Sequence, residues 1–183
     1  TAIAYSFDQD LDSIRQGLRT FNTSFFQAPG RMNVYDEHPF KVIMDYAHNP
    51  AAFKALTSLV DKLDNYNRKL IVIGCPGDRR DEDIFDGMAE LAGHYDHYIV
   101  KADDNRRRRG DDEIPLLMKK GLMMKGVSED CITVVPDEVE AIDFALSMAK
   151  ENDLLIVGGD DVTRSWKQII NFGSDIDQEK STK

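Results

Sequence analysis

The sequence predicts an α/β protein with a Rossmann-like, doubly wound and mostly parallel sheet of about five to six strands. The first observation is that short β-rich apolar runs alternate with amphipathic stretches from residue 40 onward. The second is that each amphipathic stretch repeats apolar residues at helical spacing. Strict alternation of strands and helices implies right-handed crossovers, which place helices on both faces of the sheet.

The strand and helix candidates follow one another along the chain. The predicted strands are residues 40–46, 69–75, 97–102, 131–135 and 153–157. The predicted helices between them are residues 50–63, 83–94, 113–124 and 138–150, and the loop after the last strand leads into another helix. Pro50 suits the first turn of a helix, and Asp137 is a suitable N-cap for the helix that follows it.

The regions outside this pattern suggest three parts of the chain. Residues 10–21 predict an amphipathic helix, and residues 33–45 predict a β-hairpin that leads into the first core strand. We therefore expect residues 1–28 to be the end of a preceding domain with a linker, and residues 29–172 to be the α/β domain. The polar residues 173–183 predict a disordered tail. The chain begins without methionine, which suggests a piece of a longer protein.

Composition excludes several functional classes. The 183 residues carry a net charge of −10, which argues against binding to nucleic acid or to an anionic membrane. The run of four arginines at residues 106–109 is too short and too closely flanked by aspartates to act as a polybasic tail. No apolar run approaches the roughly 20 residues of a membrane helix. The two cysteines lack the spacing of a metal site or a disulfide framework, so we expect no metal site in this chain and a cytoplasmic location.

Polar loops follow the strands, where an open parallel sheet binds its ligands. The first loop, DYAHNP at residues 45–50, places His48 where it can donate to a phosphate and Asp45 where it can accept from a ribose. The alternative is that Asp45 and Asn49 only cap the helix and His48 is a solvated turn residue.

The other three loops mix acids and bases. They are GCPGDRRD (74–81), KADDNRR (101–107) and GGDDVTR (158–164). Arg79 or Arg80 can clamp a carboxylate, and the mixed charges of the next loop suit a zwitterionic, basic amino acid better than a phosphate. Solvated turns and helix caps are the alternatives for each loop taken alone. None is a P-loop, because the Gly-Lys-Ser/Thr ending is missing.

The segment PGR at residues 29–31, followed by DYAHNP at 45–50, resembles the C-terminal domain of the Mur ligase superfamily. That superfamily includes peptidoglycan-precursor ligases, folylpolyglutamate synthases and cyanophycin synthetases. Three further stretches are most similar to the cyanophycin synthetase branch: GDRRDEDI (77–84), PDEVEAI (136–142) and DDVTRSWKQI (160–169).

This resemblance implies an ATP- and Mg²⁺-dependent ligase that makes an amide through an acyl phosphate. In the cyanophycin synthetase branch, the amine comes from arginine and the carboxylate from an aspartate-containing polymer. The resemblance further implies that the upstream ATPase domain supplies the phosphate cradle and the magnesium ligands, that the parent is a homo-oligomer, and that this piece alone is inactive. The alternatives are a muramyl-peptide or folate ligase and a non-catalytic nucleotide or amino-acid binding module.

The resemblance also assigns residues to each substrate. The expected ATP-binding residues are Arg31, Asp45, Tyr46, His48 and Asn49, with His48 in a supporting catalytic role. The expected amino-acid-binding residues are Asp78, Arg79, Asp104, Asn105, Arg106, Arg107, Asp160 and Asp161. Peptidoglycan ligases have an Asp-Asn-Pro-Arg motif near residues 104–107. Here Arg106 replaces the proline, which shifts the register of that assignment.

Overall fold

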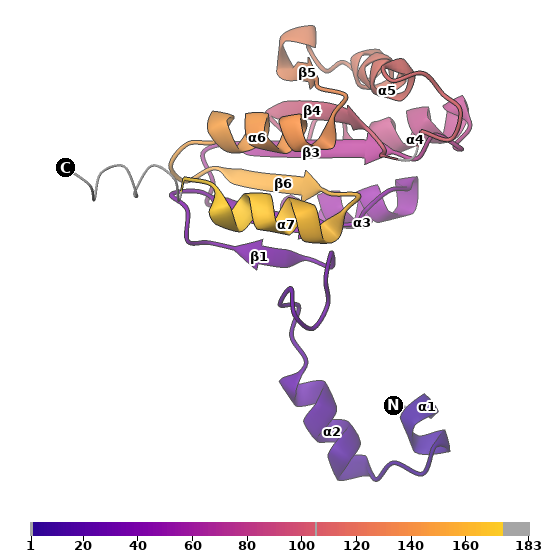
Figure 1. Cartoon of the computed structure of the whole chain (residues 1–183), viewed down its shortest axis with the longest axis vertical. Helices are drawn as coiled ribbons and strands as arrows, with labels where there is room; N and C mark the ends of the chain where they lie inside the picture. Colours follow the sequence, from indigo (N-terminus) through magenta and orange to yellow (C-terminus); the bar gives the residue numbers. More distant parts are fainter. Residues whose placement is uncertain (1, 105, 174–183) are drawn as a thin grey trace, which may run out of the picture.

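The computed structural model describes residues 2–104 and 106–173, in which six strands form one sheet flanked by helices (Figure 1). The strand order across the sheet is β1-β2-β6-β3-β4-β5. The β1–β2 pair is antiparallel and the other pairs are parallel, which confirms the predicted α/β class. The strands are β1 (Asn33–Tyr35), β2 (Lys41–Asp45), β3 (Lys69–Cys75), β4 (His97–Ala102), β5 (Ile132–Val134) and β6 (Leu154–Gly158).

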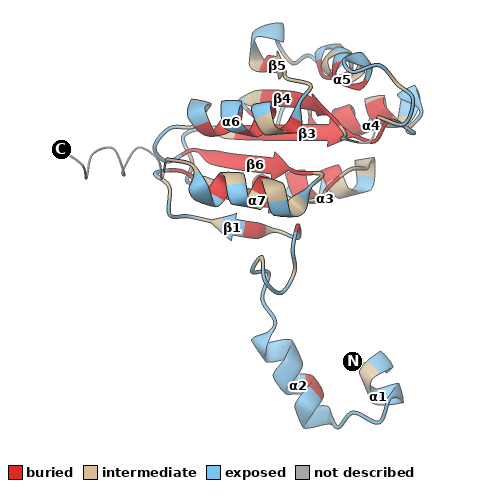
Figure 2. Ribbon diagram, viewed as in Figure 1, coloured by how far each residue is buried: buried red, intermediate tan, exposed pale blue. Residues whose placement is uncertain are grey.

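Helices cover both faces of the sheet, as predicted. The helices α3 (Pro50–Val60), α4 (Asp81–Leu91) and α5 (Glu113–Met124) share one apolar layer, and α6 (Glu138–Met148) and α7 (Val162–Asn171) share the other. Strand β3 serves both layers, because Ile71 faces the first and Val72 the second. This alternation follows from the two-residue period of a strand. Strands buried on both faces explain the continuous red of the central sheet in Figure 2.

Several element boundaries differ from the predictions by a few residues. Helix α4 begins at Asp81, and it ends at Leu91 because Ala92 is extended and Gly93 has a positive φ of 84°. Helix α6 ends at Met148 because Ala149 is also extended. A short 3₁₀ turn, Glu129–Cys131, precedes β5 where the sequence predicts the strand to start.

The predicted hairpin is present, and it begins the sheet. Residues Asn33 and Tyr35 of β1 pair with Met44 and Val42 of β2. The β2 strand then pairs in parallel with β6, so the hairpin places β1 at the edge of the sheet.

The helices α1 (Ala2–Ser6) and α2 (Leu11–Thr20) stand away from the sheet (Figure 1). Asp10 caps α2, and Ile14 is its one buried residue. The large apolar residues of this segment are exposed; they are Ile3, Tyr5, Phe7, Leu11, Leu18 and Phe21. The predicted tail at 173–183 lies, apart from Gly173, outside the described residues. No helix in the described ranges is long and apolar enough to cross a membrane.

Candidate nucleotide and amino-acid site

Four loops lie at one edge of the sheet because they follow the carboxyl ends of parallel strands. Residues 46–49, 76–80, 103–112 and 159–161 follow β2, β3, β4 and β6 and lead into α3, α4, α5 and α7. This is the edge at which doubly wound sheets bind ligands. The loops form two hollows, of which one is lined in part by His48 and the other by Tyr46.

The residues expected to bind ATP gather around the end of β2. Asp45 is half-buried, and its carboxylate accepts a hydrogen bond of 3.1 Å from the Met32 amide. Burial raises the pKa of Asp45, while the Met32 amide and Arg31 oppose the rise. The Arg31 guanidinium lies 5.5 Å from the centre of the Tyr46 ring. The structure therefore brings a cation, a carboxylate and an aromatic ring together.

The backbone beside His48 indicates which nitrogen of its ring carries a proton. Its Nδ1 lies 3.0 Å from the Tyr46 carbonyl oxygen, which can only accept a hydrogen bond. Nδ1 therefore carries a proton, and Nε2 of the neutral ring is an acceptor. Asn49 caps α3 through a 3.0 Å bond from the Ala52 amide, as the capping alternative expects.

Asn33 anchors the loop that carries Arg31, a role that the sequence did not reveal. The side chain is fully buried, and its amide donates to the carbonyls of Thr23, Ala28 and Arg31. Its oxygen accepts a 2.7 Å bond from the amide of Gly30. Gly30 has a positive φ, and a Cβ there would lie 2.7 Å from Val162. The Pro-Gly turn was the available signal, because such a turn leaves backbone groups that an amide can satisfy.

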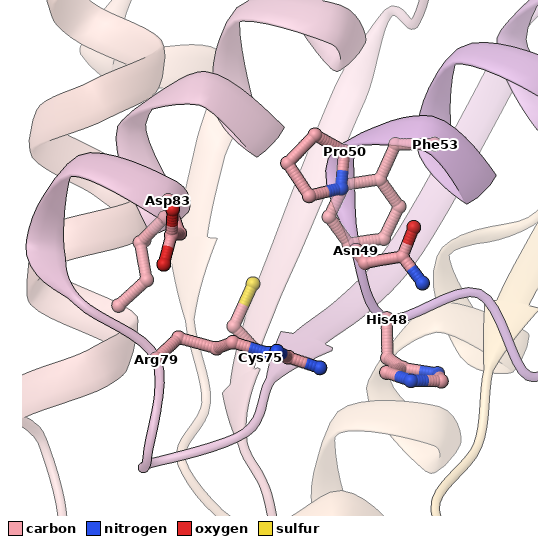
Figure 3. A pocket seen from close by; sticks show the side chains of 8 residues that line it. His48, Asn49, Pro50, Phe53, Cys75, Arg79 and Asp83 are labelled. Atoms are coloured by element: carbon pink, nitrogen blue, oxygen red, sulfur yellow. The ribbon is translucent and has the colours of Figure 1, made fainter.

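The first hollow is a cavity of about 180 Å³ between the starts of α3 and α4 (Figure 3). Its lining includes His48, Phe53, Cys75, Arg79 and Asp83. The Arg79 side chain points into the cavity toward His48 (Figure 3). Its Nε is buried and has no hydrogen-bond partner within the described residues. Burial raises the pKa of the Cys75 thiol to about 12, so at neutral pH it is protonated and a poor nucleophile.

The second hollow is wider, about 560 Å³, and more polar. Four carboxylates and one arginine line it together with Tyr46, Val162 and Thr163; the charged residues are Asp103, Asp104, Arg107, Asp160 and Asp161. Predicted amino-acid-binding residues therefore fall into both hollows, with Arg79 in the first and Asp104, Arg107, Asp160 and Asp161 in the second.

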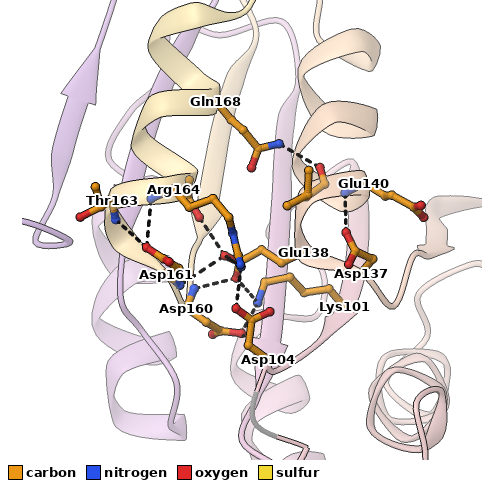
Figure 4. Close-up of polar contacts among 12 residues, drawn as sticks. Lys101, Asp104, Asp137, Glu138, Glu140, Asp160, Asp161, Thr163, Arg164 and Gln168 are labelled. Atoms are coloured by element: carbon orange, nitrogen blue, oxygen red, sulfur yellow. Dashed lines mark hydrogen bonds and ion pairs between the residues drawn. The ribbon is translucent and has the colours of Figure 1, made fainter.

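A buried charge cluster, made of Lys101, Glu138, Asp160 and Arg164, underlies the second hollow (Figure 4). The Lys101 ammonium is fully buried, 2.8 Å from Glu138 and 2.7 Å from Asp160. Glu138 also accepts from the Asp160 amide, the Arg164 guanidinium and the Ser165 hydroxyl. Burial opposes ionisation of Glu138, but these cations and donors outweigh it and lower its pKa to about 2.

Several residues predicted to bind the amino acid make hydrogen bonds within the chain, in or beside this cluster. Asp160 binds Lys101, and burial raises its pKa. Asp161 caps α7 by accepting from the amides of Thr163 and Arg164. Asp104 accepts a 2.6 Å bond from Arg164. The sequence does not reveal Lys101, Glu138 and Arg164 as a set, because nothing in their spacing predicts that the three separate elements that carry them meet.

Several predicted residues form exposed ion pairs. Arg106 pairs with Asp111, and Arg107 pairs with Asp78. Asn105 lies outside the described residues. No group of three or more His, Cys, Asp or Glu residues suited to a metal ion occurs in residues 2–104 and 106–173.

The fold and these loops define a doubly wound α/β domain with a polar crevice at its strand ends. The family model described as "Mur ligase, glutamate ligase domain" matches residues 30–160, and the chain belongs to this family. The match covers both the Arg31 and Asp45 region and the buried charge cluster up to Asp160.

Individual relatives agree with the family. The chain is 38% identical over 164 residues to a cyanophycin synthetase from Geminocystis herdmanii, covering 89% of this chain and 18% of the relative. It is 32% identical to a UDP-N-acetylmuramoyl-L-alanyl-D-glutamate--2,6-diaminopimelate ligase from Fusobacterium nucleatum, covering 72% of this chain and 26% of that one. The structure of E. coli FolC in complex with DHPP and ADP matches with a TM-score of 0.65 and 26% identity, over 88% of this chain and 34% of that chain. The chain thus spans less than a fifth of the cyanophycin synthetase that it matches.

Proposed function

We propose that this chain is the C-terminal domain of an ATP-dependent amide ligase that joins arginine to aspartate side-chain carboxylates in a polymer. The observation that carries the proposal is the similarity to cyanophycin synthetase over 89% of the chain, which includes all four loops of the site. In this proposal, residues 29–172 form the ligase domain, and residues 1–28 belong to the end of the preceding ATPase domain and a linker. The exposed apolar residues of α1 and α2 support that division.

The chemistry assigned to the whole enzyme has two steps. A carboxylate oxygen of the polymer attacks the γ-phosphorus of ATP, and ADP leaves. The amine of arginine then attacks the acyl phosphate carbon, inorganic phosphate leaves, and the nitrogen loses a proton. Acyl phosphates hydrolyse readily, so a domain that brings the amine while covering the nucleotide protects the intermediate from water.

On the nucleotide side, we assign Arg31, Asp45 and Tyr46 to ATP. A half-buried carboxylate is a suitable acceptor for ribose hydroxyls, and the guanidinium attracts phosphate. His48 lines the first hollow, and because its Nδ1 contacts the Tyr46 carbonyl, Nε2 is an acceptor in a neutral ring and a donor in a protonated ring. We assign the Mg²⁺ ligands mainly to upstream domains, as the similarity to ATP-dependent Mur ligases implies.

On the amino-acid side, we assign Arg79 to the carboxylate of arginine. Its guanidinium enters the first hollow, and its Nε lacks a partner among the described residues. The acidic second hollow, with Asp104 on its wall, has the charge to receive a cationic side chain. We further propose a cytoplasmic enzyme that is homo-oligomeric, in which this piece alone makes no ADP.

A second candidate is a ligase for a muramyl peptide or a folate, and the similarity to the diaminopimelate ligase favours it. The two candidates share the fold and the nucleotide side and differ in the amine and in the carboxylate acceptor. A non-catalytic binding module is the third possibility and predicts binding without turnover.

The test is ADP formation by the full-length protein with arginine and poly-aspartate, compared with muramyl-peptide or folate acceptors and their amines. We expect turnover only with arginine and poly-aspartate. Asp45→Asn should lower kcat/KM by roughly 10- to 100-fold through lost nucleotide positioning. Asp64→Asn, at an exposed carboxylate of the α3–β3 loop, is the matched control. Turnover of another substrate pair would exclude the arginine assignment, and unchanged activity of the Asp45 variant would exclude that nucleotide contact.

A further inference from the structure

Arg109 joins the two loops that follow β3 and β4, yet it belongs to neither set of predicted site residues. Its Nε donates to the Gly77 carbonyl at 3.1 Å, and one terminal nitrogen donates to the Arg79 carbonyl at 2.8 Å. The other terminal nitrogen contacts Asp81 at 2.8 Å and Glu113 at 2.9 Å. One guanidinium therefore holds two backbone carbonyls of the first loop and the first turns of α4 and α5.

The two loops also touch through their backbones. A Cβ at Gly77 would lie 2.2 Å from the carbonyl oxygen of Arg106, which is far inside van der Waals contact. The Arg109 side chain is 20% exposed, so its carbonyl contacts are largely shielded from water. A loop held in this way has little freedom to change the position of the side chains it carries.

We propose that Arg109 is a positioning residue that fixes Arg79 for the carboxylate of the incoming amino acid. The proposal rests on the proposed function, because that function assigns Arg79 to this carboxylate. The Arg79 carbonyl is bound by Arg109 while the Arg79 side chain extends into the first hollow toward His48 (Figure 3). The Asp81 contact fixes the start of α4, which is the other end of the same loop.

The guanidinium shape is what this position requires. Its N–H groups point outward in one plane, and here three nitrogens reach two carbonyls of the β3–α4 loop and one carboxylate in the first turn of each of α4 and α5. A lysine ammonium keeps the charge but is a single point on a flexible stem, so it cannot hold both carbonyls and both carboxylates. The neighbouring Arg108 is exposed and provides a control with the same loss of charge.

The experiment compares Arg109→Gln, Arg109→Lys and Arg108→Gln in the full-length protein. The first measurement is amide hydrogen exchange over residues 77–84, which needs no substrate. The second is steady-state kinetics with arginine and poly-aspartate. We expect both Arg109 variants to exchange faster in this loop and to raise the KM for arginine roughly tenfold or more, with the KM for ATP unchanged. The Arg108 variant should match the wild type.

The outcomes separate this proposal from the proposed function. The contacts of Arg109 with Gly77, Arg79, Asp81 and Glu113 form the Arg109 clamp. Unchanged exchange in the Arg109 variants overturns the clamp, and so does faster exchange with an unchanged KM for arginine. Equal effects of the Arg108 and Arg109 variants would show that only net charge matters and would also overturn it. If the wild type does not use arginine, the proposed function fails. The exchange data then still test the clamp, and the same KM comparison with the amine that the enzyme does use decides whether the clamp positions Arg79.

Discussion

Two regions at the same edge of the sheet join loops through charged side chains, but they do so in different environments. At the centre of the buried charge cluster, Lys101 and Glu138 are 0% and 1% exposed, while Asp160 and Arg164 at its edge are 22% and 36% exposed. In the Arg109 clamp and its neighbouring ion pairs, the carboxylates are about half exposed, as Asp81 and Glu113 are. Coulombic attraction is strong in the first environment and screened by water in the second.

An ion pair therefore has different consequences for stability according to its burial. Removal of one member of the buried charge cluster leaves its partners charged in a low-dielectric environment, which is costly. Removal of one exposed partner leaves a side chain that water can solvate. The buried charge cluster therefore holds the β6–α7 loop by contacts whose loss lowers the free energy of unfolding. The Arg109 clamp holds the β3–α4 loop by contacts whose loss changes the position of the loop.

The largest expected effect is that of Glu138→Ala on stability. The substitution leaves Lys101 buried with Asp160 alone and removes acceptors from the Arg164 guanidinium and the Ser165 hydroxyl. We expect the free energy of unfolding to fall by about 3–5 kcal/mol. Urea unfolding measures it.

The matched control for this variant is Glu140→Ala, which removes an exposed carboxylate from the same first turn of α6. It should cost less than about 1 kcal/mol. Equal losses in the two variants would mean that burial of the cluster contributes nothing.

The pH dependence of stability reports on the buried carboxylate Glu138. The pKa of Glu138 is lowered from an ordinary value of 4.5 to about 2, so its contribution to stability is complete above pH 4.5. That contribution is lost as the pH falls toward 2. Asp160 has a raised pKa and therefore contributes with the opposite sign. We expect the unfolding free energy of the wild type to fall more steeply than that of Glu138→Gln between pH 4.5 and pH 2. Parallel curves in that interval would contradict the assignment.

The fold was predictable because its signals are local. Apolar periodicity gave β3, β4 and α5 with their observed bounds, and Asp137 is the N-cap that the sequence indicates. The errors lie at helix ends such as Met148, where the backbone turns extended while the apolar pattern continues. Loop positions at one sheet edge follow from the parallel order and needed no side-chain information.

The site was predictable only as a set of loops. Asp160 and Asp161 were expected at the amino-acid site, and within this chain they bind Lys101 and cap α7. Glu138 lies 37 residues from Lys101 in the chain, so the short windows in which helices and strands are recognised never contain both partners of their ion pair. Polar pairs between residues far apart in the chain follow no regular spacing in the sequence, and only the folded structure brings the two residues together.

The smallest expected effect is that of Arg107→Gln on stability. Arg107 pairs with Asp78, and their side chains are 46% and 47% exposed. Exposed pairs contribute about 0–1 kcal/mol, so we expect a loss within that range in urea unfolding. Arg107 has a positive φ of 45°, and glutamine adopts that backbone at a similar cost, so the substitution isolates the ion pair. A loss as large as that of Glu138→Ala would abolish the distinction between the two regions, because it would require the exposed Arg107–Asp78 pair to be as poorly solvated as Lys101 and Glu138.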